Sequence, residues 1–449
     1  MRLIAVSRLF ALLLLAAFGL GALNAGATAQ EPDVLRFVFW GDPAEQAAYE
    51  RVIAGFMAAQ PGIRVEADYT SGQSDYYRKI TTDFAANAPP DVFLINYRQF
   101  AQYAAQDALT PAAPYLDAST VIDAGEYAAV SMDAFTYRGV QMCMPQNVSS
   151  LVVYFNVDLF EANDVPLPRA GWTWDEFIAA AKTLTQDSDG DGQIDQYGVV
   201  VDPVMYRMVP FVWSAGGEVV DDLDDPTTLT LDSPAAIAGL EHFISLGVAG
   251  HNVVPPEAEV AAEEDADRFM RGGAAMFLQS RREVPSLREI EGFRWDAAPL
   301  PVIDRAATVL HADAFCIAAQ AANPDAVWSF IEYAIGDAGQ TVLAETGRIV
   351  PSRLSVAETP VFLEGLPADP VAADAAVPLP PASSQVFLDN IPTIHRLPSI
   401  STWPEIEDIF NAEFDRAFYV KIDIPSAVER VIAGSHDAFA RAAASGPAP

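Results

Sequence analysis

The fold is decided by the stretch Val34-Leu35-Arg36-Phe37-Val38-Phe39-Trp40 and by the residues that follow it, Gly41-Asp42-Pro43-Ala44-Glu45. The first stretch is rich in aromatic and β-branched side chains, which predicts a strand. Asp42 as N-cap, Pro43 at the first helical position and Glu45 in the first turn then predict a helix start. A strand that leads directly into a helix is the first half of a β-α-β unit.

The alternation continues to residue 95. Apolar residues at helical spacing over 49–57 predict a helix that Pro61-Gly62 ends. Residues 63–69 alternate between apolar and polar, which predicts a half-buried strand. A helix over 74–87 and a buried strand over 91–95 follow. This order predicts an α/β fold with a parallel sheet and right-handed crossovers.

Ligands of such sheets bind at the carboxyl ends of the strands. In this chain those ends are Trp40-Gly41-Asp42, Thr70 to Asp75, and Asn96-Tyr97-Arg98. The sequence therefore predicts that these three segments lie at the edge of a binding cleft.

Composition narrows the class of protein. The chain has 449 residues, 26 Lys and Arg against 61 Asp and Glu, and a formal net charge of -35. Hydrophobic residues make up 51%, too many for a disordered acidic tail. The length exceeds one ordinary core and predicts two lobes or two domains. The charge argues against nucleic acid or an anionic lipid surface as partner.

The first 29 residues have the pattern of a secretory signal peptide. Arg2 and Arg8 precede an uncharged apolar run from Leu9 to Leu23, and Ala27-Thr28-Ala29 fits a cleavage site. The run is short for a membrane-spanning helix, which is the alternative. No Cys in this region could carry a lipid anchor. We therefore expect a soluble, exported protein.

Two further features concern the rest of the chain. Residues 140–156 and 311–318 are extended and predict strands or connections between lobes, while 359–381, rich in Pro and Ala, predicts a surface excursion. Trp403 to Phe418 and Pro425 to Ala443 predict amphipathic terminal helices. Cys143 and Cys316 could form one disulfide or stay as buried thiols, and the residues alone leave both open.

The order of these pieces resembles the family 1 extracellular solute-binding proteins of ABC transporters, the maltodextrin-binding-like group. The resemblance covers essentially the whole chain after the leader. The passages that carry it, in order, are Val34 to Trp40, Pro90 to Phe93, Leu151 to Asn156, Trp172 to Phe177, Val212 to Gly217, Gly273 to Phe277, and Ala298 to Pro301.

The resemblance implies a two-lobed, hinge-closing (type II) periplasmic binding fold. Val140 to Val148 and His311 to Ile317 become neighbouring crossings, which favours a Cys143–Cys316 disulfide. Residues 30–142 with 312–358 would form lobe 1, and 143–311 with 359–449 lobe 2. The implied partner is an ABC permease, the implied compartment the periplasm and the implied state a monomer.

A saccharide site needs flat aromatic platforms and planar polar side chains. Trp40 and Trp213 are the platform candidates. Arg281 stands at a predicted helix start facing the cleft, and His311 with Asp313 places a polar pair on a crossing. The remaining candidate ligand contacts are Asp42, Asp75, Asn96, Arg98, Gln146, Asn147 and Arg348.

An acidic loop from Asp187 to Asp195 resembles a calcium-binding loop. Its ligand positions one, three, five, seven and nine are Asp187, Asp189, Asp191, Gln193 and Asp195, with a Gly at six. The twelfth position is Gly198 and not the usual Glu. The alternative is a solvated turn. The sequence suggests Ca²⁺ in a structural role and no other cofactor.

Two alternatives to sugar capture remain open. The same fold could bind a phosphorylated solute such as a glycerophosphodiester, which needs several arginines in the cleft. A secreted calcium-stabilised hydrolase would need a pair of carboxylates, which the sequence does not single out. No Gly-x-Ser-x-Gly, His-Glu-x-x-His or phosphate-binding loop occurs in the sequence. We therefore expect a binding protein and not an enzyme.

Overall fold

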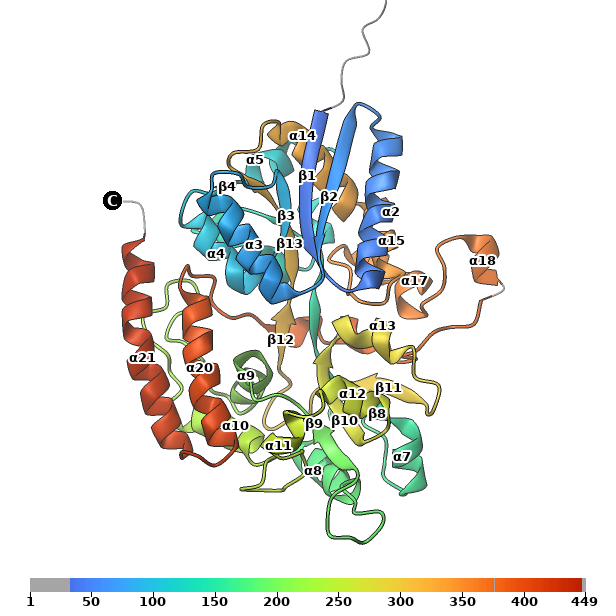
Figure 1. Cartoon of the computed structure of the whole chain (residues 1–449), viewed down its shortest axis with the longest axis vertical. Coiled ribbons are helices and arrows are strands. Elements are labelled where there is room, and N and C mark those ends of the chain that lie inside the picture. The colour runs from blue at the N-terminus through green and yellow to red at the C-terminus, as the bar shows by residue number, and fades with distance from the viewer. Residues whose placement is uncertain (1–32, 375, 446–449) are drawn as a thin grey trace, which may run out of the picture.

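The computed structural model describes residues 33–374 and 376–445. Two sheets lie one above the other in Figure 1, each flanked by helices, and the chain passes between them near the middle of the molecule. The predicted leader, residues 1–29, lies outside the described residues. No helix within 33–374 and 376–445 combines the length and apolar character needed to cross a membrane.

Lobe 1 is built on a sheet in the order β2-β1-β3-β13-β4, with β7 paired to β13. β1 runs parallel to β2 and β3, which confirms the predicted β-α-β order, whereas β13 is antiparallel to β3. The strands are β1 (Asp33–Trp40), β2 (Ile63–Thr70), β3 (Val92–Asn96), β4 (Leu109–Thr110), β7 (Met144–Pro145) and β13 (Asp313–Ala318). The fully buried Phe37 packs against Phe315 and Phe330, so β1, β13 and α14 share one core.

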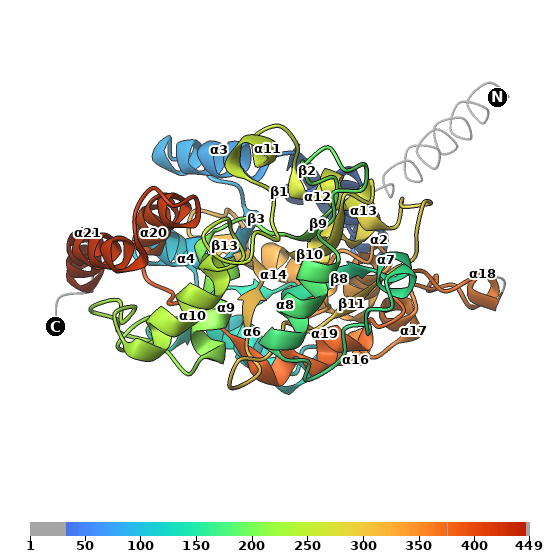
Figure 2. The ribbon, with the colours of Figure 1, turned by 90° about the horizontal axis from the view of Figure 1, so that it is seen from below.

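Helices cover both faces of this sheet (Figures 1 and 2). Asp42 caps α2 by accepting from the Glu45 amide at 2.8 Å, as the sequence predicted. The helices are α2 (Pro43–Ala59), α3 (Gln73–Ala85), α4 (Tyr97–Ala104), α5 (Ala113–Ala118), η1 (Ala124–Glu126), α6 (Ala129–Ala134), α14 (Pro324–Ile335) and α15 (Asp337–Ala344), and a hairpin of β5 (Thr136–Tyr137) and β6 (Val140–Gln141) follows α6.

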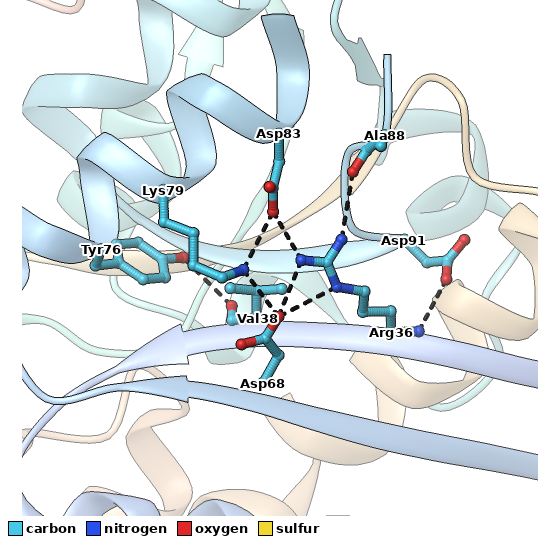
Figure 3. A network of polar contacts seen from close by, with 8 residues as sticks. All are labelled: Arg36, Val38, Asp68, Tyr76, Lys79, Asp83, Ala88 and Asp91. Carbon is cyan, nitrogen blue, oxygen red and sulfur yellow. Dashed lines mark hydrogen bonds and ion pairs between the residues drawn. The ribbon is translucent and has the colours of Figure 1, made fainter. Parts of the chain in front are cut away.

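A charged network fastens β1, β2 and α3 together (Figure 3). The Arg36 guanidinium contacts Asp68 at 2.9 Å and Asp83 at 2.7 Å, and Lys79 reaches the same two carboxylates. The Arg36 amide also donates to Asp91, just before β3. Burial acts to raise the pKa of Asp68, and the bonds from Lys79 and Arg36 outweigh it, so this pKa is lowered. The network ties β1, β2 and α3 to one another.

Lobe 2 is built on a sheet in the order β14-β12-β8-β10-β9, with β11 also paired to β8. Every residue of the long strand β8 is buried, as expected for the centre of a covered sheet. The strands are β8 (Ser149–Asn156), β9 (Tyr197–Val200), β10 (Ala274–Ser280), β11 (Trp295–Ala298), β12 (Thr308–His311) and β14 (Ile394–His395).

A capping box of Thr173 and Glu176 opens α8 within the passage Trp172 to Phe177 that carries the resemblance. The C-terminal α20 and α21 pack together beside lobe 2, and their bounds match the predicted terminal helices closely (Figure 1). The helices of this half are α7 (Val157–Ala162), α8 (Trp174–Thr183), α9 (Met205–Ser214), α10 (Pro234–Ile244), α11 (Glu257–Val260), α12 (Asp265–Met270), η2 (Arg281–Glu283), α13 (Val284–Leu287), α16 (Leu354–Ala357), α17 (Pro360–Leu363), α18 (Pro370–Asp374), α19 (Gln385–Asp389), η3 (Ile391–Thr393), α20 (Trp403–Phe418) and α21 (Ile424–Ala444). The Pro- and Ala-rich segment carries α17 and α18, and α18 projects from the body in Figure 1.

The chain changes sheets between β7 and β8 and again at Ala312, between β12 and β13. Asn147 joins these two crossings, because its amide nitrogen donates to the His311 carbonyl at 3.0 Å and its oxygen accepts from the Asp313 amide at 2.7 Å. A third segment around Pro351, which the sequence did not predict, runs antiparallel beside the first on its way from α15 to the helices of lobe 2.

The disulfide implied by the resemblance is confirmed. Cys143 and Cys316 are bonded, with a Cα–Cα distance of 4.6 Å and a sequence separation of 173 residues. Both cysteines are fully buried, next to the pairing of β7 with β13. The bridge therefore ties the first crossing to the strand that carries the second crossing back into lobe 1.

We expect the Cys143→Ser/Cys316→Ser double variant to lose about 3–5 kcal/mol of unfolding free energy, because the bridge closes a long loop. Urea unfolding at neutral pH, followed by circular dichroism, measures this loss. An unfolding midpoint equal to that of the oxidised parent protein would show that the bridge adds no stability.

Candidate functional site

A polar cavity of about 70 Å³ lies between the two sheets, beside the crossings. It is lined at the carboxyl ends of β1, β3 and β10, as the strand-end rule predicts. The lining residues are Trp40, Glu45, Gln73, Asn96, Arg98, Asn147, Ser149, Tyr206, Gln279, Ser280, Arg282, His311, Asp313, Arg348 and Ile349. Both lobes and all three connecting segments thus contribute side chains to one site.

The part of the cavity that Trp40 lines lies at the junction of β1 and α2. Arg348 reaches back to this junction, where it pairs with Asp42 and, at 2.6 Å, with Glu45. Its guanidinium lies 5.8 Å from the centroid of the Trp40 ring. Gly41 permits this geometry, because a Cβ at that position would stand 2.1 Å from the Glu45 carboxylate. The indole is therefore held between a strand end and a paired arginine.

The second wall of lobe 1 comes from the junction of β3 and α4. Asn96 caps α4, and its amide nitrogen donates to the Asp313 carboxylate at 3.1 Å. Arg98 donates to the Asn96 side-chain oxygen at 3.2 Å and pairs with Glu407 of α20. The geometry links a residue of the second crossing, Asp313, to the strand end that the sequence singled out.

Besides Ser149 of β8 and His311 of β12, lobe 2 contributes Tyr206 from α9 and three residues from the end of β10 and η2. Arg98 of lobe 1 lies 4.5 Å from the Tyr206 ring centroid, and the His311 ring meets Tyr206 edge-on at 5.3 Å. Arg282 is half exposed and contacts its neighbour Glu283 at 3.1 Å. Tyr206 and Arg282 therefore line the cavity from lobe 2.

Burial dominates the electrostatics of the cavity. It raises the pKa of Glu45 to about 7 although Arg348 opposes this, and it raises the pKa of Asp313 against the Asn96 bond and nearby arginines. Burial, with the charges of Arg98 and other arginines, holds the pKa of His311 well below its usual range. The imidazole is therefore neutral at pH 7.

Two buried ring nitrogens of the cavity, Trp40 Nε1 and His311 Nε2, have no hydrogen-bond partner among the described residues. An unpaired buried polar group costs free energy, so both atoms favour a ligand that brings its own donors and acceptors. The arrangement can bind and orient a small polyhydroxyl molecule.

The structure brings seven of the predicted ligand contacts together. These are Trp40, Asn96, Arg98, Asn147, His311, Asp313 and Arg348. Asp42 stands just behind them, where it caps α2 and pairs with Arg348.

The other four predicted contacts lie elsewhere. Asp75 is exposed and pairs with Arg78, and Gln146 is buried behind the crossing, where its carbonyl accepts from Gln340. Arg281 is fully buried, with its guanidinium over the rings of Phe362 and Phe387. There it donates to backbone carbonyls of the segments that follow α15, so it points away from the cavity.

Trp213 is the remaining exception. Its ring stacks on His395 at 4.8 Å and lines a separate hollow of about 620 Å³. Trp213 is buried, so His395 covers the face that a sugar would need.

Sequence reasoning missed Glu45, Gln73, Ser149, Tyr206, Gln279, Ser280, Arg282 and Ile349. The sequence already explains Glu45 as an acid in the first turn of a helix. Only the structure shows that its side chain turns toward Gly41 and the cavity. Gln279 and Ser280 end β10, so the strand-end rule applied to this strand reaches them. Tyr206 sits within a helix and gives no sequence signal.

The acidic loop gathers three of its five predicted ligands. Carboxylate oxygens of Asp187, Asp189 and Asp195 lie within 4.8 Å of one another. Asp187 also accepts from the amides of two loop glycines, and Asp195 accepts from the Ser188 amide. The predicted ligand Asp191 is not among these carboxylates and accepts instead from the side-chain amide of Gln193, the fifth predicted ligand. The three carboxylates could hold a hard cation at the surface, away from the cavity.

A family model described as bacterial extracellular solute-binding protein matches residues 40–341. A protein of Brucella abortus named only as a binding protein is 23% identical over 400 residues, which cover 87% of this chain and 89% of that protein. The diacetylchitobiose binding protein of Streptomyces coelicolor is 25% identical over 314 residues, 67% of this chain and 68% of that protein.

Solved structures show the same two-lobed fold. An ABC substrate-binding protein of Listeria monocytogenes in complex with cycloalternan superposes with a TM-score of 0.79 at 22% identity, over 92% of this chain and all of that one. A maltose-bound protein of Thermotoga maritima gives a TM-score of 0.72 at 21% identity, over 89% and 98%. The likeness extends across both lobes and the connecting segments.

The raised pKa of Glu45 makes stability depend on pH. The folded protein holds a proton up to about pH 7, whereas the unfolded chain releases it near its ordinary value of 4.5. The free energy of unfolding should therefore fall as pH rises from about 4.5 to 7, by on the order of 2–3 kcal/mol from this group. Urea unfolding at pH 5 and pH 8 measures the difference.

Asp265 acts in the same direction, because burial beside Asp202 raises its pKa to about 7. Glu45→Gln and Asp265→Asn should each flatten the pH profile, and the exposed Glu405→Gln should leave it unchanged. A parent protein that is more stable at pH 8 than at pH 5 would contradict the assignment.

Proposed function

The chain belongs to the bacterial extracellular solute-binding protein family, and from this premise we propose that it captures a sugar or sugar-like solute between its lobes and delivers it to an ABC permease. The observation that carries the proposal is the interlobe cavity, in which Trp40 and Tyr206 face a set of amides, hydroxyls and charged groups. Relatives that bind diacetylchitobiose and cycloalternan support the same class of ligand.

The chemistry of the cavity favours hydroxyl groups. Each hydroxyl both donates and accepts, and the cavity offers planar partners of both kinds in Asn96, Gln73 and Gln279. Trp40 adds an aromatic ring and an unpartnered donor, and Asp313 adds a strong acceptor. A sugar presents an apolar face and a rim of hydroxyls, so it satisfies both kinds of surface.

The size of the cavity supports capture by hinge motion. Its volume of about 70 Å³ is well below the ~300–1,000 Å³ of ordinary ligand pockets. A sugar can enter only if the lobes move apart about the crossings, and closure then buries it. A ligand that touches both lobes favours the closed arrangement.

A phosphorylated solute is less well supported, because every arginine that lines the cavity faces a carboxylate. Arg98 pairs with Glu407, Arg282 with Glu283, and Arg348 with Asp42 and Glu45. Arg281, which the sequence placed at the cleft, lies outside the cavity.

The contacts of the cavity do not support the hydrolase alternative, which needs a pair of free carboxylates. Glu45 and Asp313 both line it, yet Arg348 binds the first and Asn96 the second. The family is one of binding proteins. Cleavage of the leader near Ala29 would leave the protein soluble in the periplasm, where we propose that it acts as a monomer.

We propose that replacing Trp40 by Ala weakens sugar binding at least about tenfold, because the aromatic platform is lost. Trp40→Phe should keep the platform and lose the indole donor, and Tyr206→Phe should lose one hydroxyl. A thermal-shift screen over sugars, polyols and phosphorylated solutes identifies a ligand first, and calorimetry then measures its affinity.

The matched control is Trp213→Phe. Trp213 lies on the same helix as Tyr206 but lines a separate hollow and not the cavity. Its affinity should equal that of the parent. Unchanged affinity in folded Trp40→Ala, or a phosphorylated solute as the strongest ligand, would contradict the proposed site.

For the acidic loop we propose a structural Ca²⁺ at Asp187, Asp189 and Asp195. Millimolar Ca²⁺ should raise the thermal midpoint, because an ion that binds only the folded state stabilises it, by about 2.7 kcal/mol at 100 times its Kd. Differential scanning fluorimetry with Ca²⁺ and with Mg²⁺ measures the shift. Asp189→Asn should abolish it, whereas Asp222→Asn in a second acidic loop should not; equal shifts in both variants would refute the site.

A further inference from the structure

Arg98 and Glu407 form a buried ion pair at the edge of the cavity. Their side chains are 15% and 7% exposed, although 309 residues separate them. Burial acts to lower the pKa of Arg98, and the Glu407 carboxylate outweighs it, so the guanidinium stays charged. Glu407 does not line the cavity. The pair therefore needs an explanation beyond direct contact with a solute.

The two partners belong to opposite lobes. Arg98 lies on α4, directly after the lobe 1 strand β3. Glu407 lies on α20, which packs on α4 of lobe 1 at the level of Arg98 and is anchored to lobe 2 by its following turns. The Asn411 side chain accepts from the Met205 amide of α9 at 2.7 Å, and Phe418 packs on Phe243 of α10. Lys421, just after α20, pairs with Glu257 of α11. Motion of lobe 2 should therefore carry Glu407 with it.

The same guanidinium makes a second contact with lobe 2. It stacks over the Tyr206 ring at 4.5 Å while its Nε donates to Asn96 within lobe 1. Separation of the lobes would remove both Glu407 and Tyr206 from Arg98. In the closed arrangement, loss of the Glu407 charge would leave the Arg98 guanidinium buried without its partner, which is costly, whereas in the separated arrangement water would solvate it.

From this arrangement we infer that Glu407 is a positioning residue for solute capture, which holds Arg98 of lobe 1 against Tyr206 of lobe 2 and so fastens the lobes at the cavity edge. The fastening acts without a solute and shifts the lobes of the free protein toward closure. Its effect on affinity rests on the proposed function, whereas its effect on the free protein does not.

The test is the distance between the lobes in protein without solute. Spin labels at Ser74→Cys on α3 and Asp267→Cys on α12, both exposed, report that distance by pulsed electron resonance. Glu407→Gln keeps the size of the side chain and removes its charge. We expect its distance distribution to shift to longer values, and the affinity for the solute identified by the screen to fall at least about tenfold.

Glu413→Gln is the matched control, because Glu413 lies on the same helix and pairs with Arg416 away from the cavity. Its distances and affinity should equal those of the parent. Arg98→Gln removes the other half of the pair and serves if Glu407→Gln does not fold.

Unchanged distances in the folded variant overturn the inference, whatever happens to affinity. Longer distances support it even if no sugar binds, in which case only the proposed function fails.

Discussion

The structure depends on how the backbone N–H and C=O groups find hydrogen-bond partners where the chain passes from one sheet to the other. Where the chain leaves one sheet for the other, its buried backbone groups need partners outside the two regular sheets. Some of them bond between crossings, as the Val148 amide does to the Val350 carbonyl. One side chain of the first crossing resolves this at the second, because the Asn147 side-chain amide accepts from the Asp313 backbone amide and donates to the His311 carbonyl. The Cys143–Cys316 bridge fixes the same pair of segments covalently. His311 and Asp313 consequently enter the cavity from a rigid base, and the lobes have a defined axis about which to move.

The charge balance of the cavity differs from that of the whole chain. The chain carries a net charge of -35, yet the cavity holds three arginines. Each is matched by carboxylates, since an unpaired buried charge is costly. Burial also pushes His311 to the neutral form and Glu45 toward it. The walls of the site are thus polar without a strong net field, which suits a hydroxyl-rich solute better than an anion.

Local rules predicted part of the site well. Trp40, Asn96 and Arg98 follow predicted strands, and parallel strands bring their carboxyl ends to one edge. The same rules failed where a turn decides the direction in which a side chain points. Arg281 and Arg282 are adjacent, yet η2 sends the first into the core and the second to the cavity. Glu45 was explained by its place in the first turn of a helix, which hid its second role. The contact of Glu407 with Arg98 joins residues too far apart in sequence for any periodic pattern to predict.

The sequence by itself determined the β-α-β start, the helix caps, the two terminal helices and the strand ends where a ligand would bind. These depend on neighbours within a few residues, where propensity, periodicity and capping act. The tertiary structure alone decided which strand ends face each other, that β13 runs antiparallel beside β3, and which arginine meets which carboxylate. Such contacts are fixed by packing between segments far apart in the chain, and their free energy depends on burial that exists only after both lobes have formed.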